Sequence, residues 1–495
     1  MEHPSHVDVL IIGAGISGIG AACRLTEELP QKSYAILEAR DAIGGTWDLF
    51  RYPGVRSDSD LHTLGYQFRP WTGENAIVDG PEVLQYIRDT AAEYGVDGNI
   101  RYGCQVTGAA WESDEALWTV EATIDGRETT MTCGWLFCAS GYFRYDHGYQ
   151  PRFEGQERFA GQIIHPQDWP EDLDYAGKRV VVIGSGATAV TLVPALAEQA
   201  AHVTMLQRSP SYVISVPRKD ALANLLNRLL PEEMAASITR RKNIWRQRFV
   251  FSLAQSRPNL VKGFLRWSLK QQLPADYEID RHFAPDYDPW DQRLCAVPSG
   301  DFFKSLSRGD CSVVTDQIAS FSDDGIELVS GERLEAEIIV TATGLELLAL
   351  GGIELSVDGR GVDLPEALVY KGAMLSEVPN FAFAIGNYNV SLTLKVGIVI
   401  DYVWRVLAYM DRCGFNSCTA VNPDPSQETR PMLDFGAGYV SRSLHLFPRQ
   451  GSIEHWEMSQ DLARDQRELA SELTADGALK FERVASARGR VPVAS

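Results

Sequence analysis

The sequence predicts an α/β fold made of two Rossmann-like dinucleotide-binding domains, with a helical insertion in the second. In residues 7–18 and again in residues 179–189, an apolar strand runs into a glycine-rich turn and then an apolar helix. The length of 495 residues is too great for one core. We therefore expect the first domain in residues 1–145 and 331–495, and the second in residues 146–330 with the insertion at about 217–290.

The first glycine turn is Gly13-Ala-Gly15-Ile-Ser-Gly18, followed by a helix that Pro30 stops. Glycines at these places allow a tight turn and let a pyrophosphate approach the N-H groups at the helix N-terminus. The next strand, residues 34–37, ends at Glu38, whose carboxylate can accept hydrogen bonds from a ribose hydroxyl. Strand, turn, helix, strand and acid together predict a dinucleotide site.

The second turn is Gly184-Ser-Gly186-Ala-Thr-Ala189. The unit around it differs from the first unit at the end of the strand that follows the helix. There the acid is replaced by Arg208, followed by Ser209. A carboxylate would repel the 2′-phosphate of NADP, whereas a guanidinium binds it bidentately and Ser209 can assist. The first turn therefore predicts FAD and the second predicts NADPH.

Two longer motifs accompany the turns. Residues 159–170 read F-x-G-x-x-x-H-x-x-x-W-P, from Phe159 through His165 to Pro170, and residues 44–58 read G-G-x-W followed by Y-P-G-x-x-x-D. In both, the chain resembles the type I Baeyer–Villiger monooxygenases; simpler flavin-containing monooxygenases resemble it without the Trp-Pro end. Trp47 stands where flavin disulfide reductases have a redox cysteine, which leaves the flavin to react directly with oxygen.

The resemblance also implies roles for individual residues. Arg293 is the catalytic candidate, held over the flavin, and Asp58 orients it through a charge-assisted pair. Gln292 stands where many members have Lys, which leaves Arg208 for the 2′-phosphate. We expect His165 to organise the structure, and we do not count it as catalytic. The FAD contacts are Gly13, Gly15, Ser17, Gly18, Glu38, Thr46, Trp47, Asp58 and Val106, and the NADP contacts are Gly184, Ser185, Gly186, Ala187, Thr188, Ala189, Thr191, Arg208 and Ser209.

The activity that the resemblance implies is insertion of one oxygen atom beside a ketone carbonyl, giving an ester or lactone. NADPH would reduce the flavin, dioxygen would form a flavin C4a-peroxide, and NADP+ would stay bound during turnover; no metal is needed. The same chemistry would oxidise sulfur in thioethers or thioamides. Two alternatives stay open: a sulfur- or nitrogen-oxidising flavin-containing monooxygenase with little ketone activity, and a flavin redox sensor.

Composition limits partners and location. The net charge of -20 argues against nucleic acid, and eight cysteines without a C-x-x-C pair suit a reducing cytoplasm. Within the insertion, residues 240–270 hold nine basic and no acidic residues, with Leu260, Val261, Phe264, Leu265 and Leu269 at helical spacing. Such a segment can lie weakly on an anionic membrane, although packing against the protein itself is favoured. Nothing in the sequence predicts an oligomeric state.

Overall fold

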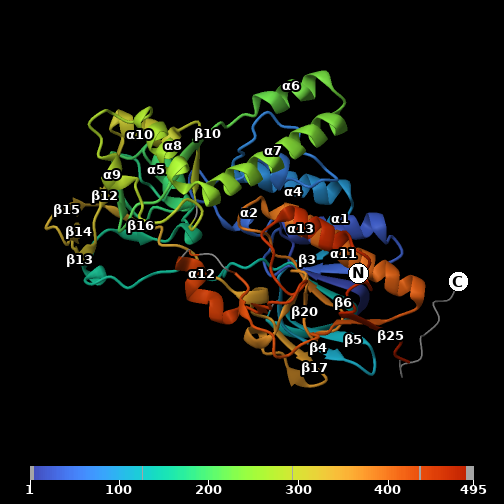
Figure 1. Ribbon diagram of the computed structural model, residues 1–495. Coiled ribbons are helices and arrows are strands. Elements are labelled where there is room, and N and C mark those ends of the chain that lie inside the picture. The colour runs from blue at the N-terminus through green and yellow to red at the C-terminus, as the bar shows by residue number, and fades with distance from the viewer. Residues whose placement is uncertain (1–4, 125, 293, 434–435, 437, 486–495) are drawn as a thin grey trace.

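The computed structural model describes residues 5–124, 126–292, 294–433, 436 and 438–485. These residues form two lobes, each built around its own sheet, and Figure 1 shows the larger lobe with both chain ends and the smaller lobe on the left. The predicted α/β class with two Rossmann-like units is confirmed by the topology of the two sheets.

The sheet of the larger lobe has the order β18-β17-β4-β5-β6-β1-β2-β3, and β21 also pairs with β6. Strands β3, β2, β1, β6 and β21 are parallel neighbours, while β4 and β5 add an antiparallel extension. Core side chains cover both faces, as parallel strands require. The bounds are β1 His6–Ile12, β2 Tyr34–Leu37, β3 Ile100–Arg101, β4 Cys104–Glu112, β5 Leu117–Ile124, β6 Arg127–Cys138, β17 Glu354–Val357, β18 Arg360–Gly361 and β21 Phe381–Phe383.

The sheet of the smaller lobe is parallel throughout, in the order β12-β9-β8-β16-β7. Strand β8 is the central strand of this sheet and runs directly into a glycine turn, as β1 does between β6 and β2 in the first sheet. Apolar clusters again cover both faces. The bounds are β7 Gln162–Ile164, β8 Arg179–Ile183, β9 His202–Gln207, β12 Cys311–Thr315 and β16 Ile338–Thr341.

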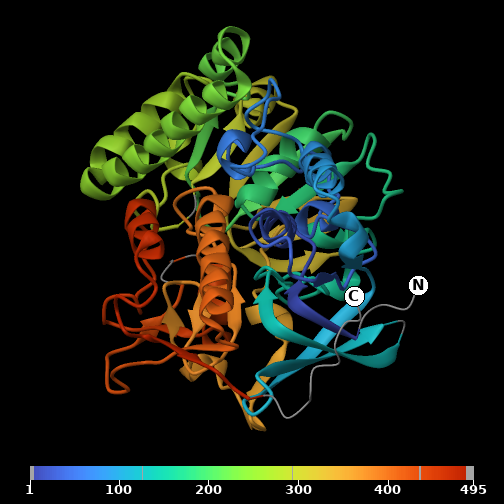
Figure 2. The same cartoon turned by 90° about the vertical axis from the view of Figure 1, so that its right-hand side faces the viewer.

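Helices and small sheets complete the lobes, and Figure 2 shows the long α11 against the body of the larger one. The helices outside the insertion are α1 Ile16–Glu28, α2 Thr46–Leu49, α3 Leu61–Leu64, α4 Gly80–Glu93, α5 Ala187–Leu196, α10 Asp301–Arg308, α11 Leu392–Cys413, α12 Gly438–Ser443 and α13 Leu462–Ala470. The short strands are β10 Val213–Val216 with β11 Cys295–Pro298, β13 Ile318–Ser322, β14 Gly325–Leu328 and β15 Arg333–Glu335, β19 Val369–Tyr370 with β20 Met374–Leu375, β22 Ser417–Ala420 with β25 Leu479–Glu482, and β23 Arg430–Pro431 with β24 Arg449–Gln450.

The expected domain boundary at residue 331 needs correction. Strand β16 lies between β8 and β7 in the second sheet, so the smaller lobe extends to Thr341. The chain returns to the larger lobe only after this strand. Strand pairing between distant segments decides the boundary, and a single strand pattern does not reveal its partner.

The two segments that cross between the lobes are bonded to each other. Residues 142–149 lead into the smaller lobe and residues 343–348 lead out of it. Leu348 N-H donates to the Tyr142 carbonyl at 3.0 Å and Arg144 N-H donates to the Glu346 carbonyl at 2.9 Å. The Thr343 hydroxyl donates to the Tyr149 carbonyl at 2.6 Å. We call this pair of segments the strap.

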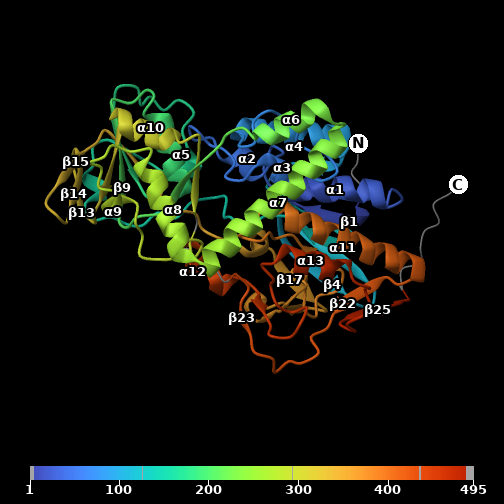
Figure 3. The same ribbon diagram turned by 45° about the horizontal axis from the view of Figure 1, so that its top comes forward.

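The insertion is helical, as predicted. It leaves the smaller lobe after β10 and returns at β11, and these two strands pair in parallel. Figure 3 shows α7 crossing from the larger lobe toward α8 on the smaller one. The helices are α6 Ala221–Leu229, α7 Glu232–Ser256, α8 Pro258–Lys270 and α9 Ile279–His282.

The fold buries only some of the apolar side chains that were expected on one side of residues 260–269. Val261, Leu265 and Leu269 are buried, whereas Leu260 and Phe264 are 58% and 51% exposed. The helix therefore packs through a narrower stripe than the spacing suggested. No helix in the described part of the chain is long and apolar enough to cross a membrane.

Candidate active site and nucleotide sites

The first glycine turn leaves no room for side chains. Gly13 has φ +99°, and a Cβ there would lie 2.6 Å from the Ala139 carbonyl oxygen. A Cβ on Gly18 would lie 1.8 Å from the Gly13 carbonyl oxygen. Gly15 precedes α1, and no side chain of the described residues caps that helix. The turn therefore requires glycine at positions 13 and 18, and it leaves the first N-H groups of α1 without a side-chain cap, which fits a pyrophosphate. Ser17 lies in the first turn of α1.

Glu38 holds this turn in place. It is 5% exposed and directly follows β2. Its Oε2 accepts from Ala14 N-H at 2.7 Å and its Oε1 accepts from Arg40 N-H at 2.9 Å. Burial raises the pKa of its carboxyl, while the two backbone hydrogen bonds lower it. Each oxygen has a further lone pair, so the predicted ribose contact remains compatible with this geometry.

The G-G-T-W motif lies beside the first turn. Gly44 N-H donates to the Ala14 carbonyl at 3.0 Å, and Gly15 and Gly44 form an isolated parallel bridge. The hydroxyls of Thr46 and Tyr145 are 3.1 Å apart. Folding thus brings together two motifs that the sequence analysis joined only by resemblance.

Trp47 lines a cavity of about 710 Å³ between the lobes, with Tyr52 and Arg56 on one side and α5 on the other. Arg56 forms an ion pair with Asp301 across it. Asp58 and Arg208 do not line this cavity. Val106 is 4% exposed and packs within the core of the larger lobe, so its contact with FAD stays a prediction from resemblance.

The second glycine turn repeats the first. Gly184 has φ +129°, and a Cβ there would lie 2.3 Å from the Ala342 carbonyl oxygen. Gly186 precedes α5, which likewise lacks a side-chain cap among the described residues. Ala187, Thr188 and Ala189 form the first turn of α5. The Ser185 and Ser211 hydroxyls are 2.8 Å apart, which links the turn to the base of the insertion.

Thr191, a further predicted NADP contact, lies on the helix that follows this turn. It lies in the second turn of α5 and is 7% exposed. A Cβ on Gly54 would lie 2.9 Å from the Thr191 carbonyl oxygen, so Thr191 packs against the larger lobe. Thr191 also lines the cavity between the lobes, so the NADP contact that the resemblance implies for it stays a prediction.

Arg208 and Ser209 directly follow β9, beside the second turn, and both are exposed. Within the described residues Arg208 makes no ion pair. Its guanidinium is therefore available to a ligand that binds at the turn, as the prediction of a 2′-phosphate contact requires.

Arg293, the catalytic candidate, lies outside the described residues. Asp58 is exposed and accepts from the Ser59 hydroxyl at 3.4 Å. Its loop leads into α3, whose N-cap Asp60 accepts from Thr63 N-H at 3.1 Å.

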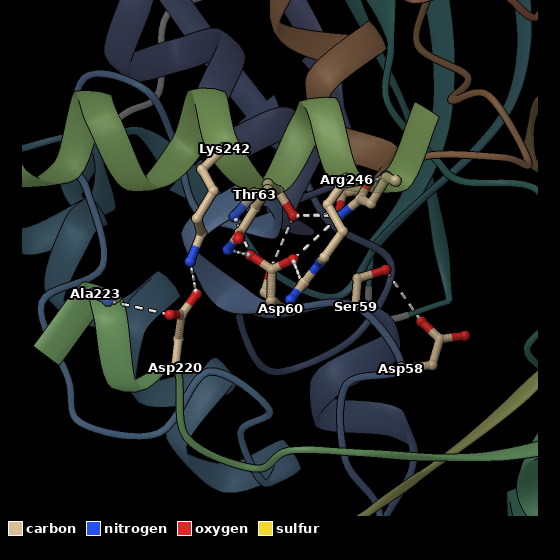
Figure 4. A network of polar contacts seen from close by, with 11 residues as sticks. Asp58, Ser59, Asp60, Thr63, Asp220, Ala223, Lys242 and Arg246 are labelled. Atoms are coloured by element: carbon tan, nitrogen blue, oxygen red, sulfur yellow. Dashed lines mark hydrogen bonds and ion pairs between the residues drawn. The ribbon is translucent and has the colours of Figure 1, made fainter. Parts of the chain in front are cut away.

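Sequence analysis missed the network around Asp60, which Figure 4 shows between the Asp58 loop and the insertion. Asp60 is 5% exposed. It accepts from Asn243 Nδ2 at 2.9 Å and Gln247 Nε2 at 3.1 Å, and Arg246 lies 3.6 Å away. All three partners are on α7, so this network, the α7 anchor, ties the insertion to the loop that carries Asp58. Its signal was present: an acid before Leu61, and two amides four residues apart on a predicted helix.

His165 joins the fingerprint stretch to the strap. It is 5% exposed, its Nδ1 accepts from Gln167 N-H at 3.2 Å, and its Nε2-H donates to the Gly344 carbonyl at 3.2 Å. Glycine at position 161 allows a close approach of the backbone, because a Cβ there would lie 2.3 Å from the Glu337 carbonyl oxygen. Trp169 packs edge-on against Tyr175. These contacts support the structural role predicted for His165.

Burial lowers the pKa of His165, so the ring is neutral in the folded protein. As the pH falls below about 6.5, the unfolded chain takes up a proton that the folded ring resists, and stability falls. We expect a loss of about 1 kcal/mol, the usual scale of one hydrogen bond, since a protonated Nδ1 cannot accept from Gln167. His165→Gln should show a smaller fall in Tm between about pH 7.5 and about pH 5.5 than the parent. His147→Gln, at an exposed ring, is the control; an unchanged fall in His165→Gln would contradict the assignment.

Comparison with known proteins places this geometry in a family. A model of flavin-binding monooxygenase-like proteins matches residues 68–274, and one of NAD(P)-binding Rossmann-like domains matches residues 11–72. The chain is 51% identical to the FAD-containing monooxygenase EthA of Mycobacterium tuberculosis over 477 residues, which cover 96% of this chain and 98% of the relative. The chain belongs to the FAD-containing monooxygenases. Another relative in this family, the putative FAD-containing monooxygenase MymA of the same organism, is 49% identical over 490 residues, covering 96% of this chain and 97% of the relative.

Solved structures show the same fold for this FAD-containing monooxygenase. An oxidized steroid monooxygenase bound to NADP matches with a TM-score of 0.76 at 24% identity, covering 96% of this chain and 99% of that one. An open crystal structure of cyclohexanone monooxygenase matches with a TM-score of 0.75 at 22% identity, over the same shares. The predicted class, a flavin monooxygenase using FAD and NADP with O2 and a small-molecule substrate, is confirmed by family membership.

Proposed function

We propose that this FAD-containing monooxygenase converts ketones to esters or lactones at the expense of NADPH and O2, and also oxidises sulfur in thioethers or thioamides. The observation that carries the proposal is the complete stretch from Phe159 to Pro170, whose His165 joins the two lobes at Gly344. The matched structures named as cyclohexanone and steroid monooxygenases add support at the level of the fold.

We assign FAD to the first glycine turn and NADP to the second. The fit rests on the two cradles that a Cβ would fill and on the uncapped first turns of α1 and α5. Glu38, Thr46 and Trp47 lie around the first cradle. Ser185 and the first turn of α5 form the second, with Arg208 and Ser209 beside it. When bound, FAD supplies the activation of oxygen.

The chain itself would bind, orient and stabilise charge. The guanidinium of Arg293 keeps its proton under physiological conditions, so in our proposal it stabilises negative charge that develops on oxygen during transfer to the substrate. Asp58 is the residue that would orient it. The α7 anchor holds the Asp58 loop against the insertion, and so fixes the distance of that carboxylate from the second lobe.

The decisive experiment incubates the purified protein with NADPH, O2 and a panel of ketones and sulfides, and identifies products by mass. We expect esters or lactones from ketones together with sulfoxides from sulfides. Sulfoxides with no ester from any ketone would replace the proposal by that of a sulfur-oxidising flavin-containing monooxygenase. NADPH consumption without any oxygenated product would contradict both.

Arg208→Ala should raise the KM for NADPH by roughly ten- to a hundred-fold, since a charge-assisted contact to phosphate contributes about 1.5–3 kcal/mol. The KM for NADH should change little, because NADH lacks the 2′-phosphate. Steady-state kinetics with both coenzymes measure this, with Arg241→Ala, an exposed arginine on α7, as the control. Equal efficiency of the parent protein with NADPH and NADH would overturn the assignment of Arg208.

A further inference from the structure

Large exposed apolar side chains are concentrated on the insertion. Ten of the twelve in the described part of the chain lie on α6, α7 and α8. They are Leu222, Leu225, Leu229, Met234, Ile238, Trp245, Phe249, Leu260, Phe264 and Trp267; the other two are Tyr102 and Val329. A contiguous concentration of this kind indicates an interaction surface, whereas single exposed apolar residues are ordinary.

On each helix the exposed apolar residues recur at helical spacing, while the opposite side is buried. On α7, Ile238 and Trp245 are seven residues apart and Phe249 follows after four, whereas Ala235 and Asn243 are buried. On α8, Leu260, Phe264 and Trp267 follow the same rule. Helices α6 and α7 pack together, as do α7 and α8, and all three lie at the outside of the molecule (Figure 2). We call these outward sides the insertion face.

Aromatic rings dominate the middle of this face. Trp245 and Phe249 are 64% and 50% exposed and stack at a centroid distance of 5.2 Å. Phe264 and Trp267 form a second ring pair at 5.8 Å, and Trp267 is 57% exposed. Exposed aromatic pairs on amphipathic helices suit the boundary between lipid head groups and acyl chains.

The charges beside the aromatic part of the face are cationic, whereas the exposed Glu232 and Glu233 stand before Met234 at the start of α7. Residues 240–270 contain no Asp or Glu in a chain whose net charge is -20. The structure uses some of the nine basic residues internally, for example in the pairs of Lys242 with Asp220 and Arg266 with Asp280. Arg241, Arg257 and Lys270 are exposed and make no ion pair with any residue the structure describes. An apolar face with free cations beside it complements an anionic surface.

We propose that the insertion face docks on an anionic phospholipid bilayer, with Trp245, Phe249 and Trp267 entering the head-group region and the free cations binding lipid phosphates. A second copy of the chain is a poorer occupant. A two-fold interface would set the same acid-free segment against itself and bring like charges together.

The test measures flotation of the flavin-loaded full-length protein with vesicles of phosphatidylcholine and phosphatidylglycerol. We expect binding to the mixed vesicles at low salt, weaker binding at high salt, and weaker binding to pure phosphatidylcholine. The combined variant Trp245→Ser, Phe249→Ser and Trp267→Ser should lose binding by about tenfold or more. Val329→Ser, at a side chain that is 65% exposed outside the insertion, should bind like the parent.

Flavin content and turnover of a water-soluble substrate show that the variants are folded. Failure of the parent to bind anionic vesicles at low salt would overturn the proposal, and so would equal binding by the triple variant. Light scattering tests whether a second copy of the chain binds the insertion face instead. A dimeric mass that becomes monomeric in the triple variant, without vesicle binding, would identify the face as an interface between copies.

Discussion

Arg293→Ala is expected to lower the formation of oxygenated product by about a hundred- to a thousand-fold, the scale for removing one preorganised donor that stabilises an anion. Cys295, which begins β11, lies close to the second glycine turn. Cys295 N-H donates to the Tyr212 carbonyl at 2.9 Å, and the neighbouring Ser211 hydroxyl is 2.8 Å from that of Ser185.

Stopped-flow measurements have to separate flavin reduction from oxygen transfer, because an arginine beside NADP affects both. We expect FAD to remain bound, since Arg293 is remote in sequence from the first turn. Asp58→Ala should act in the same direction but less severely, because it removes the orienting carboxylate and leaves the charge. Gln292→Ala is the matched control. A near-parent rate of ester formation in Arg293→Ala would show that other groups stabilise the charge.

Gly18→Ala is expected to weaken FAD binding by about a hundredfold, so that the protein purifies largely without flavin. The added Cβ would lie 1.8 Å from the Gly13 carbonyl oxygen, and only a shift of the backbone can relieve that contact. Overpacking against backbone costs about 3 kcal/mol, which corresponds to this change in affinity. The ratio of flavin to protein absorbance measures it.

The control for this substitution is Gly98→Ala, where a Cβ would have no atom within 4 Å. It should retain full flavin content and an unchanged Tm. Full flavin content in Gly18→Ala would mean that the turn tolerates displacement and that FAD affinity depends on other contacts.

Local signals explain what the sequence predicted well. The strands at residues 34–37 and 179–183 and both glycine turns were identified because the turn chemistry and the apolar runs lie within a few residues of each other. Glu38 and Arg208 followed from the same short pattern. Family resemblance linked residues 44–47 to the first turn, and the fold confirms that proximity.

Contacts between segments that are distant in sequence explain which features the sequence did not predict. The strand at residues 338–341 is equally apolar whichever sheet receives it, and its neighbours β7 and β8 are remote in sequence. The exposure of Leu260 and Phe264 depends on the shape of the surface beneath α8. For the α7 anchor, the sequence shows a capping acid at Asp60 and two amides on one side of a helix, but it does not show that Asp60 and Asn243 meet.

The strap defines an axis about which one lobe can rotate relative to the other. Its two segments are bonded along their length, so pulling the lobes apart or sliding one along the other would break several hydrogen bonds at once. Rotation of one lobe about the line of the strap breaks the fewest of these hydrogen bonds. The α7 anchor opposes this rotation, because it ties the insertion, which starts and ends in the smaller lobe, to the Asp60 loop of the larger lobe. Loosening Asp60 should therefore weaken one of the contacts that oppose this rotation, alongside the ion pair of Arg56 with Asp301 and the pair of Arg218 with Asp79, and leave the hydrogen bonds of the strap intact.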